Sequence, residues 1–246
     1  MFVVFCLLLL TLAGGLVGIY LWSQIRAIPD WYLIADGRLN NLKASERVDL
    51  AGAAESRVIQ AAGGWKIDWV TGEVERQGGP HGRPVRAMAG EDLVIELFWD
   101  EINSWLREKL PDWKNTGIWH FPDFMEDIRL GGERGRLQIG FQVRKKGVPR
   151  GVIWVEGMPE VDPDGNVRIG ELSLHFGRLQ LPLSQARDWL KTQIDSAREE
   201  QKAVLDLLSG GSIDPGWIDH RHNVRLTGVQ ITPDLVRLNY RLEPGE

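Results

Sequence analysis

The N-terminus of this chain limits its possible structures more than any other segment, because no charged residue lies between Phe2 and Trp22. The run is rich in Leu, Val, Phe and Ile. Its length matches the roughly 20 residues that a helix needs to cross a hydrocarbon core about 30 Å thick. Tyr20 and Trp22 lie at its C-terminal edge, where amphipathic rings favour the headgroup region. We therefore expect residues 1–26 to form a transmembrane anchor.

A cleaved signal peptide is the alternative interpretation of this run. It predicts a basic segment before the apolar residues and a small-residue cleavage site after them. No Lys or Arg precedes the run, and apolar sequence continues beyond the small residues at Ala13 and Gly14. An uncleaved anchor is therefore favoured.

The composition is that of a folded, mildly acidic protein. Of the 246 residues, 43% are apolar and 26% charged, which is enough to bury a core without disulfides. The net charge of -5 argues against nucleic-acid binding, which needs a positive surface against the phosphates. A basic group, Arg144, Lys145, Lys146 and Arg150, is interpreted as a solvated hairpin turn. Cys6 is the only cysteine, so no intrachain disulfide is possible.

Residues 27–90 are expected to form a juxtamembrane helical segment followed by a loop. Pro29 disfavours the helical conformation of the residue before it and so ends the anchor helix. Ser45 is a typical N-cap, and the helix that follows runs to about Ala62, before two glycines. Residues 72–90 are rich in Gly, Pro and charge, which predicts a long loop.

Residues 91–246 are expected to form an α+β domain, because strand and helix patterns come in blocks rather than in alternation. Asp92–Phe98 has the composition of a strand. Asp100–Leu110 has apolar residues at helical spacing, and Pro111 is expected to stop that helix. Residues 112–124 are predicted to be irregular and aromatic.

Alternation of apolar and polar residues then predicts an antiparallel meander. The strands are Arg136–Arg144, Gly151–Met158 and Val167–Phe176, with a turn at 163–166 and a shift of phase near Gly170. In the second strand, Trp154 is placed on one face, with Ile153 and Val155 on the other. The meander is expected to form a curved sheet.

A long helix and a hairpin complete the predicted domain. Ser184–Leu208 has an apolar stripe at helical spacing, and a sheet with one apolar face needs such a cover. The hairpin comprises residues 223–231 and 235–242, joined by a turn at 232–234.

No motif predicts catalysis, a cofactor or a metal. His220 and His222 could face one ion from a strand, but the sequence specifies no third ligand, so a polar strand entry is the preferred interpretation. Neither the glycines at 131–132 nor those at 210–211 match a phosphate-binding loop. We therefore expect a protein that is not an enzyme.

The tryptophan count is high, at 11 residues. Such aromatics fill cores, but they also line apolar pockets and membrane interfaces. An apolar groove is predicted where they cluster. Its expected lining residues are Trp99, Trp105, Leu106, Phe141, Trp154, Leu174 and Trp189.

Three segments resemble uncharacterised bacterial membrane-anchored proteins. They are Phe98–Leu106 (FWDEINSWL), the stretch from Gly170 to Pro182 that ends in Leu-Pro before a helix, and the closing hairpin at Val229–Val236. Their order is similar to that of YpmS-like proteins and, more distantly, of tubular lipid-binding domains. The resemblance implies a curved antiparallel sheet wrapped on a long helix, an interior groove for an acyl chain, and no catalytic residues.

The leading hypothesis is a membrane-tethered, non-enzymatic domain that binds or shields a lipid or other apolar ligand. An accessory subunit of a larger membrane complex is the alternative, in which Ile28–Tyr32 would be an exposed aromatic segment. A hydrolase that uses His220 and His222 is the third. The flanking charges give a weak inward bias, but the resemblance favours a single-pass cell-membrane protein with an extracytoplasmic domain.

Overall fold

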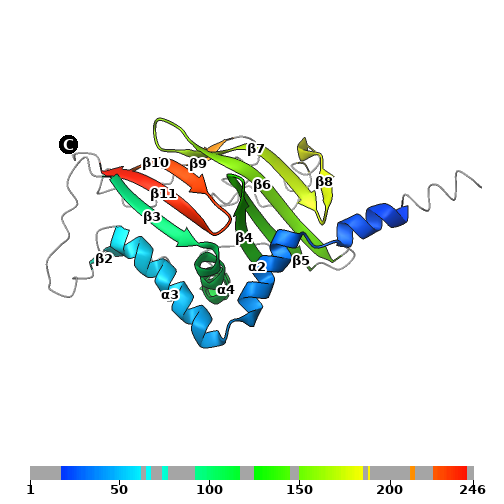
Figure 1. Cartoon of the computed structure of the whole chain (residues 1–246), viewed down its shortest axis with the longest axis horizontal. Helices are drawn as coiled ribbons and strands as arrows, with labels where there is room; N and C mark the ends of the chain where they lie inside the picture. The colour runs from blue at the N-terminus through cyan, green and yellow to red at the C-terminus, as the bar shows by residue number, and fades with distance from the viewer. Residues whose placement is uncertain are drawn as a thin grey trace, which may run out of the picture.

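The structure is a computed structural model, and it describes residues 18–61, 65–67, 74–76, 92–116, 125–144, 150–184, 188, 211–213 and 224–242. It is an α+β fold with antiparallel sheets and helices, which confirms the predicted class. Figure 1 shows two larger sheets side by side, three helices against them, and a short N-terminal helix that protrudes at the right.

The larger sheet contains six strands, of which five form a meander in the order β4–β5–β6–β7–β8. The strands are β4 (Met125–Glu133), β5 (Arg136–Val143), β6 (Gly151–Val161), β7 (Val167–Phe176) and β8 (Leu179–Leu181), and β9 (Ser212–Ile213) pairs with β7. The predicted strands are confirmed as β5, β6 and β7. The strand β4 was not predicted, and the tight turn after it depends on Gly135, whose φ of +80° suits glycine.

Two β-bulges bend this sheet. In β4 the register shifts between Glu126 and Arg129, and Asp127 adopts a φ of +50°. In β7 the residue Glu171 has a φ of +47°, and the register with β6 shifts beside it. The second bulge is the physical cause of the phase shift predicted near Gly170, because one extra residue changes which side chains face each side.

The smaller sheet has three strands in the order β10–β11–β3. The closing hairpin is confirmed as β10 (Val224–Ile231) and β11 (Leu235–Leu242), with β11 paired to β3 (Asp92–Phe98). The prediction of one curved sheet was therefore too simple. The hairpin pairs with a strand more than a hundred residues earlier in the chain, and local sequence patterns do not specify such a partner.

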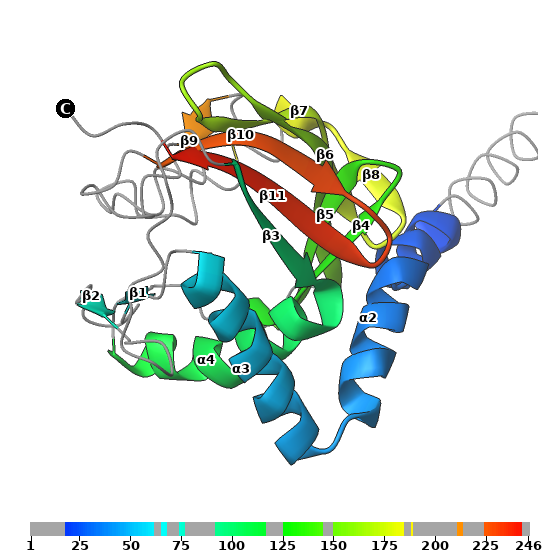
Figure 2. The same ribbon diagram turned by 60° about the vertical axis from the view of Figure 1, so that its left-hand side comes forward.

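Three helices pack against the sheets (Figure 2). They are α2 (Asp30–Asn41), α3 (Ala44–Ala61) and α4 (Trp99–Thr116). The helix predicted from Ser45 is confirmed as α3, although it begins at Ala44, so Ser45 lies in its first turn rather than at the N-cap. The predicted stop at Pro111 was wrong, because α4 continues through it to Thr116. The helix α2 was not predicted as such, although its start directly after Pro29 confirms the predicted break.

Some predictions lie outside the described residues. They include most of the apolar run, nearly all of the helix expected over Ser184–Leu208, and most of the loop expected over 72–90. Within that loop, β2 (Val74–Arg76) is a strand and pairs with β1 (Trp65–Ile67).

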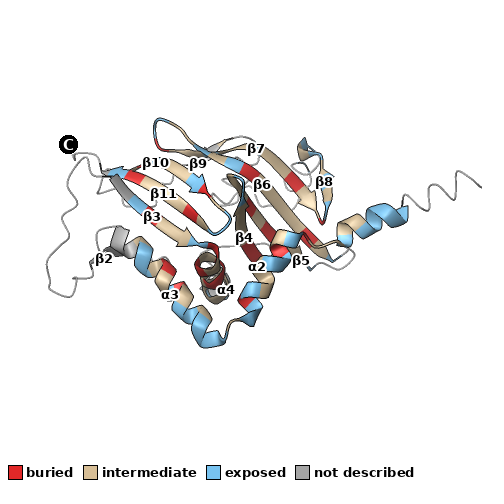
Figure 3. Ribbon diagram, in the orientation of Figure 1, coloured by how far each residue is buried: buried red, intermediate tan, exposed pale blue. Residues whose placement is uncertain are grey.

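Two clusters of the core lie where the two larger sheets meet, and Figure 3 shows further buried bands on the helices. Ile95, Leu226 and Tyr240 of the smaller sheet pack with Val161 and Val167 of the larger one. A second cluster is formed by Trp99, Ile231 and Val236 with Leu130 and Leu137. The two sheets approach each other closely at Gly132, where a Cβ atom would lie 2.3 Å from the Ile231 side chain. Glycine is required there for the sheets to pack.

The N-terminal helix at 18–26 leads directly into the domain. Its end is held by the turn between β7 and β8, because the Arg178 amide donates to the Gln24 carbonyl at 2.9 Å. The Arg178 guanidinium also pairs with Asp30 at 2.8 Å. In the described part of the chain, no helix combines the length and apolarity that crossing a bilayer requires. The expected span lies before residue 18 for most of its length.

Candidate functional site

One face of the larger sheet is apolar throughout its described strands. The pairing places Ile139 beside Val155, and Val155 beside Leu174, so these side chains share a face. Extending the alternation along β4–β8 gives no polar or charged side chain on that face. We call it the apolar face, and its larger side chains are Met125, Ile128, Leu130, Leu137, Ile139, Phe141, Val143, Ile153, Val155, Val161, Val167, Ile169, Leu172, Leu174, Phe176, Leu179 and Leu181.

The smaller sheet packs against one end of the apolar face. Leu130, Leu137, Val161 and Val167 belong to the buried clusters formed with it. Toward the other end, Leu174 and Val143 are buried, but most of the side chains around them keep partial exposure. These partly exposed side chains are Ile139, Phe141, Ile153, Val155, Phe176, Leu179 and Leu181. This half of the face is the candidate site for an apolar ligand.

Of the seven residues predicted to line a groove, the six that the structure describes do not share one surface. Phe141 and Leu174 lie on the apolar face. Trp154 lies on the opposite face, where it stacks on His175 with ring centroids 4.0 Å apart. Trp189 lies outside the described residues.

The other three predicted residues lie on or beside α4. Trp99 is buried between the sheets, and its Nε1 donates to the Thr232 carbonyl at 2.9 Å. Trp105 donates to Glu55 of α3, and Leu106 follows it on the same helix. Trp99 therefore packs at the end of the apolar face that the smaller sheet covers, whereas Trp105 joins α4 to α3.

Sequence reasoning missed the best candidates because it gave weight to tryptophan. Ile153 and Val155 were correctly placed opposite Trp154, but the tryptophan side was chosen. The useful signal was the uninterrupted apolar alternation of three consecutive strands. A face that carries no polar residue over that length is a stronger indication than the position of any single aromatic ring.

The opposite face of the larger sheet is polar, and α2 covers part of it. Trp31 lies over two glycines, so that a Cβ atom on Gly140 would lie 3.0 Å from its ring and one on Gly131 would lie 3.2 Å from it. Tyr32 is also buried. The structure therefore places both aromatics against the sheet, where they cap the domain. The prediction that Ile28–Tyr32 is an exposed aromatic segment was wrong, because the rings of Trp31 and Tyr32 pack on the sheet.

A serine, a histidine and a glutamate meet on this polar face. The Ser173 hydroxyl lies 3.2 Å from His175 Nε2 and donates to Glu156 at 3.3 Å. The Glu156 carboxylate is 3.9 Å from the same Nε2 atom. A serine–histidine–carboxylate relay needs the hydroxyl and the carboxylate on different ring nitrogens. This cluster does not have that geometry.

Burial lowers the pKa of His175, although the nearby Glu156 carboxylate opposes that shift. The imidazole is therefore held in its neutral form, stacked on Trp154.

A buried arginine joins α2 to β4. Arg129 is 1% exposed and pairs with Asp36 of α2 at 2.6 Å. Beside it, the Tyr32 hydroxyl donates to the Asp127 carbonyl at the β4 bulge, and burial raises the pKa of this phenol. The bulge thus exposes a backbone acceptor that α2 needs. We interpret this cluster as the attachment of the helix to the sheet.

No group of three potential metal ligands occurs among the residues that the structure describes. His220 and His222 lie outside them.

The comparisons with known proteins gave no relative. The chain matches no protein-family model, no curated protein and no solved structure. The resemblance to YpmS-like proteins and tubular lipid-binding domains therefore stays a prediction.

Proposed function

We propose that this protein is a membrane-tethered, non-enzymatic domain that binds or shields a lipid or another apolar ligand on the apolar face. The proposal is supported chiefly by the absence of polar side chains from that face along the described β4–β8 strands. A soluble antiparallel sheet commonly leaves one face to water, and that face is then polar. Here the polar face is the one that α2 covers.

An acyl chain is the ligand that best suits this surface. Each methylene that leaves water against apolar side chains contributes about 0.8 kcal/mol, so a chain can bind without any specific polar contact. Phe141, Ile153 and Phe176 are neighbours on β5, β6 and β7 and form the centre of the proposed contact. They are partly exposed, as residues at a ligand contact would be.

We further propose that the apolar N-terminal run is a single-pass anchor in the cell membrane and that the domain is extracytoplasmic. The described end of that run supports the anchor, because Ile19 and Tyr20 are 69% and 62% exposed on a helix that leaves the body of the protein. Large apolar side chains at such exposure favour an apolar environment.

The accessory-subunit hypothesis has less support. It was based on an exposed aromatic segment, and Trp31 and Tyr32 are instead used within the domain. Binding to a protein partner stays a prediction, and we assign no surface of this chain to it.

Lipid photocrosslinking in the membrane tests the ligand. A photoreactive phenylalanine analogue is introduced at Val155 of the full chain, and irradiated membranes are analysed by mass spectrometry. We expect a lipid adduct at this position. Glu156 is the matched control, because it is the next residue on the same strand and faces the opposite side.

Two results would contradict the proposal. Adducts of equal yield at positions 155 and 156 would indicate contact with the bulk bilayer only. Adducts at position 155 to protein residues, with no lipid, would indicate that the chain itself fills the face. In the supporting case, Val155→Asp in a chain with the photoreactive residue at Ile153 should abolish the lipid adduct.

A further inference from the structure

The N-terminal helix is fixed to the domain rather than joined by a flexible linker. Only residues 27–29 separate it from α2. The turn at Gly177 packs so closely that a Cβ atom there would lie 2.2 Å from the Gln24 carbonyl oxygen. A Cβ atom on Gly151 would lie 2.8 Å from the Ile25 carbonyl oxygen, so the start of β6 also contacts this helix. The direction in which the helix leaves therefore determines how the domain is oriented.

Antiparallel order brings several connections to the same end. In a meander, alternate turns lie at opposite ends of the sheet. The end of β5, the start of β6 and the turn between β7 and β8 share the end where the helix leaves (Figure 1). The tight turns at Arg134–Gly135 and at 162–166 share the other end. We call these the helix end and the far end.

The helix end carries excess positive charge among its described residues. Arg144 pairs with Glu126 at 3.0 Å, and Arg178 pairs with Asp30 at 2.8 Å. Arg26 and Arg150 are also at this end and are exposed, and no described carboxylate lies within ion-pair distance of either. Two guanidinium groups are therefore left to interact with an external anion.

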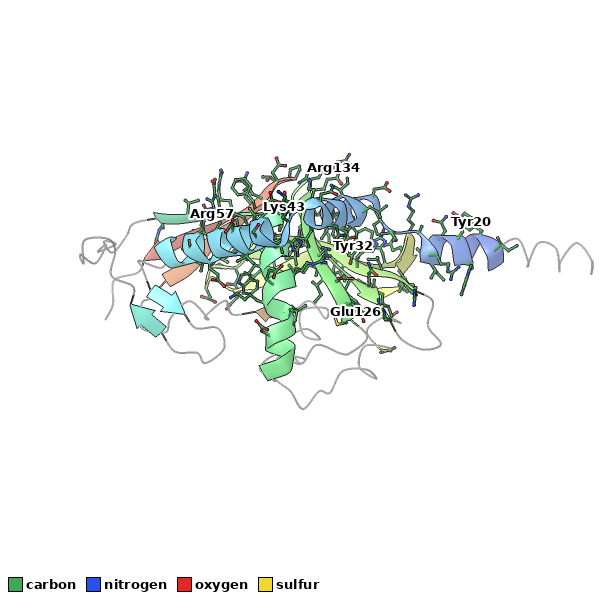
Figure 4. All side chains as sticks on the ribbon, turned by 90° about the horizontal axis from the view of Figure 1, so that it is seen from below. Tyr20, Tyr32, Lys43, Arg57, Glu126 and Arg134 are labelled. Atoms are coloured by element: carbon green, nitrogen blue, oxygen red, sulfur yellow. The ribbon has the colours of Figure 1, made fainter. Side chains whose placement is uncertain are left out.

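The protruding helix has the side chains of a membrane–water boundary. Figure 4 shows Tyr20 on this helix, well away from the sheets, whereas Tyr32 lies within the body. Trp22 is 48% exposed, and the Arg26 guanidinium lies 5.1 Å from the centre of its ring. A tryptophan followed by an arginine one helical turn later is suited to the headgroup region, where the ring and the charge face different environments.

From this geometry we infer that the helix end of the domain lies against the bilayer, with Arg26 and Arg150 in contact with anionic lipid headgroups. The far end then points away from the membrane. This inference rests on the proposed anchor. A fixed helix sets the orientation, and the unpaired guanidinium groups are attracted to negative surface charge within a Debye length of the headgroups.

Quenching of a fluorophore by lipid tests the orientation. The full chain with Cys6→Ala is labelled at Gln180→Cys near the helix end or at Asp164→Cys at the far end. Both positions are exposed. The protein is inserted into vesicles of phosphatidylcholine that contain a lipid with a nitroxide quencher on its headgroup. We expect quenching at position 180 to exceed that at position 164 several-fold.

The headgroup contact is tested by adding phosphatidylglycerol to the vesicles. Quenching at position 180 should increase, and high salt should reverse the increase. Arg150→Glu should remove the increase, whereas Arg134→Glu, whose side chain is 88% exposed at the far end, should leave it unchanged. The same increase in both variants would overturn the contact with anionic headgroups.

The fixed helix is tested with a matched pair of glycines. Gly177 and Gly135 both have positive φ, at +62° and +80°, so alanine strains the backbone at either position. Only a Cβ atom on Gly177 would meet the helix, since the nearest atom to one on Gly135 is 3.9 Å away on Met158. Gly177→Ala should therefore reduce quenching at position 180, and Gly135→Ala should not.

The outcomes separate this inference from the proposals on which it depends. Equal quenching at positions 164 and 180 in inserted protein overturns the orientation and leaves the anchor intact. Failure of the full chain to enter vesicles overturns the anchor and the orientation together. The proposed binding of lipid at Val155 is tested separately by photocrosslinking, which does not depend on the fluorophore at position 164 or 180.

Discussion

At the scale of single residues, the ion pair between Arg129 and Asp36 is expected to be costly to break. The Arg129 guanidinium is buried, and Asp36 at 2.6 Å is its nearest carboxylate partner among the described residues. Asp36→Asn would leave the charge without that partner, and we expect a loss of about 2 kcal/mol in the free energy of unfolding. Denaturant unfolding of the detergent-solubilised chain measures it.

An exposed ion pair provides the control for this prediction. Glu160 pairs with Arg168 at 2.8 Å, with side chains 48% and 58% exposed. Glu160→Gln should cost less than about 1 kcal/mol, because water screens both groups. Equal losses in the two variants would mean that burial does not govern the strength of the Arg129 pair.

His175 predicts a pH dependence of stability. Its folded-state pKa is lowered below the ordinary value of 6.5 because burial disfavours the imidazolium. The unfolded chain therefore binds a proton at a higher pH than the folded chain does. Stability from this residue is complete above pH 6.5 and is lost as the pH falls toward the lowered folded-state value. His175→Gln should reduce the dependence of the melting temperature on pH over this range. An unchanged pH dependence in this variant would exclude His175 as its cause.

At the scale of elements, the contact between the two larger sheets depends on Gly132. A Cβ atom there would lie 2.3 Å from Ile231 and 2.8 Å from Trp99. Gly132→Ala should destabilise the protein by about 1–3 kcal/mol, because a packed interface must move. Gly52 in α3 is the control, since a Cβ atom there meets nothing within 4 Å. Gly52→Ala should stabilise by up to about 1 kcal/mol, and thermal unfolding compares the two.

Elements that depend on local sequence were predicted well, and those that depend on distant contacts were not. The strands β5 and β7 and the helix α3 have strong periodicity and clear ends. The strand β4 was missed because Gly131 and Gly132 interrupt its pattern of side chains. These glycines let Trp31 and Ile231 approach the strand. Glycine is needed at these positions because of side chains on other elements, and the neighbouring sequence does not reveal those contacts.

The same distinction explains the candidate site. The alternation placed Ile153 and Val155 on a common face, and that part of the apolar face could be predicted. Which face α2 covers could not, because it depends on Trp31 packing over Gly140 from more than a hundred residues away. Without that contact, the tryptophan-bearing side of β6 was the natural choice, and the structure places it opposite the apolar face.

At the scale of the whole molecule, the proposed extracytoplasmic location makes the far end accessible from outside the cell. With Cys6→Ala and Asp164→Cys, a thiol reagent that cannot cross membranes should label intact cells as fully as lysed ones. Asp164 lies in an exposed turn, so the folded domain does not hinder the reaction. Labelling only after lysis would place the domain on the cytoplasmic side.

The connection at residues 27–29 has a consequence for how the length of the chain can vary. On one side of it, Gln24 is bonded to the turn at Arg178, and on the other, Tyr32 is bonded to the bulge at Asp127. Both attachments are to the same sheet, so the distance between them is fixed. Inserting or deleting one residue would rotate α2 and break one attachment or the other. The connection therefore acts as a spacer of set length, which holds the helix at residues 18–26 at one angle to the larger sheet.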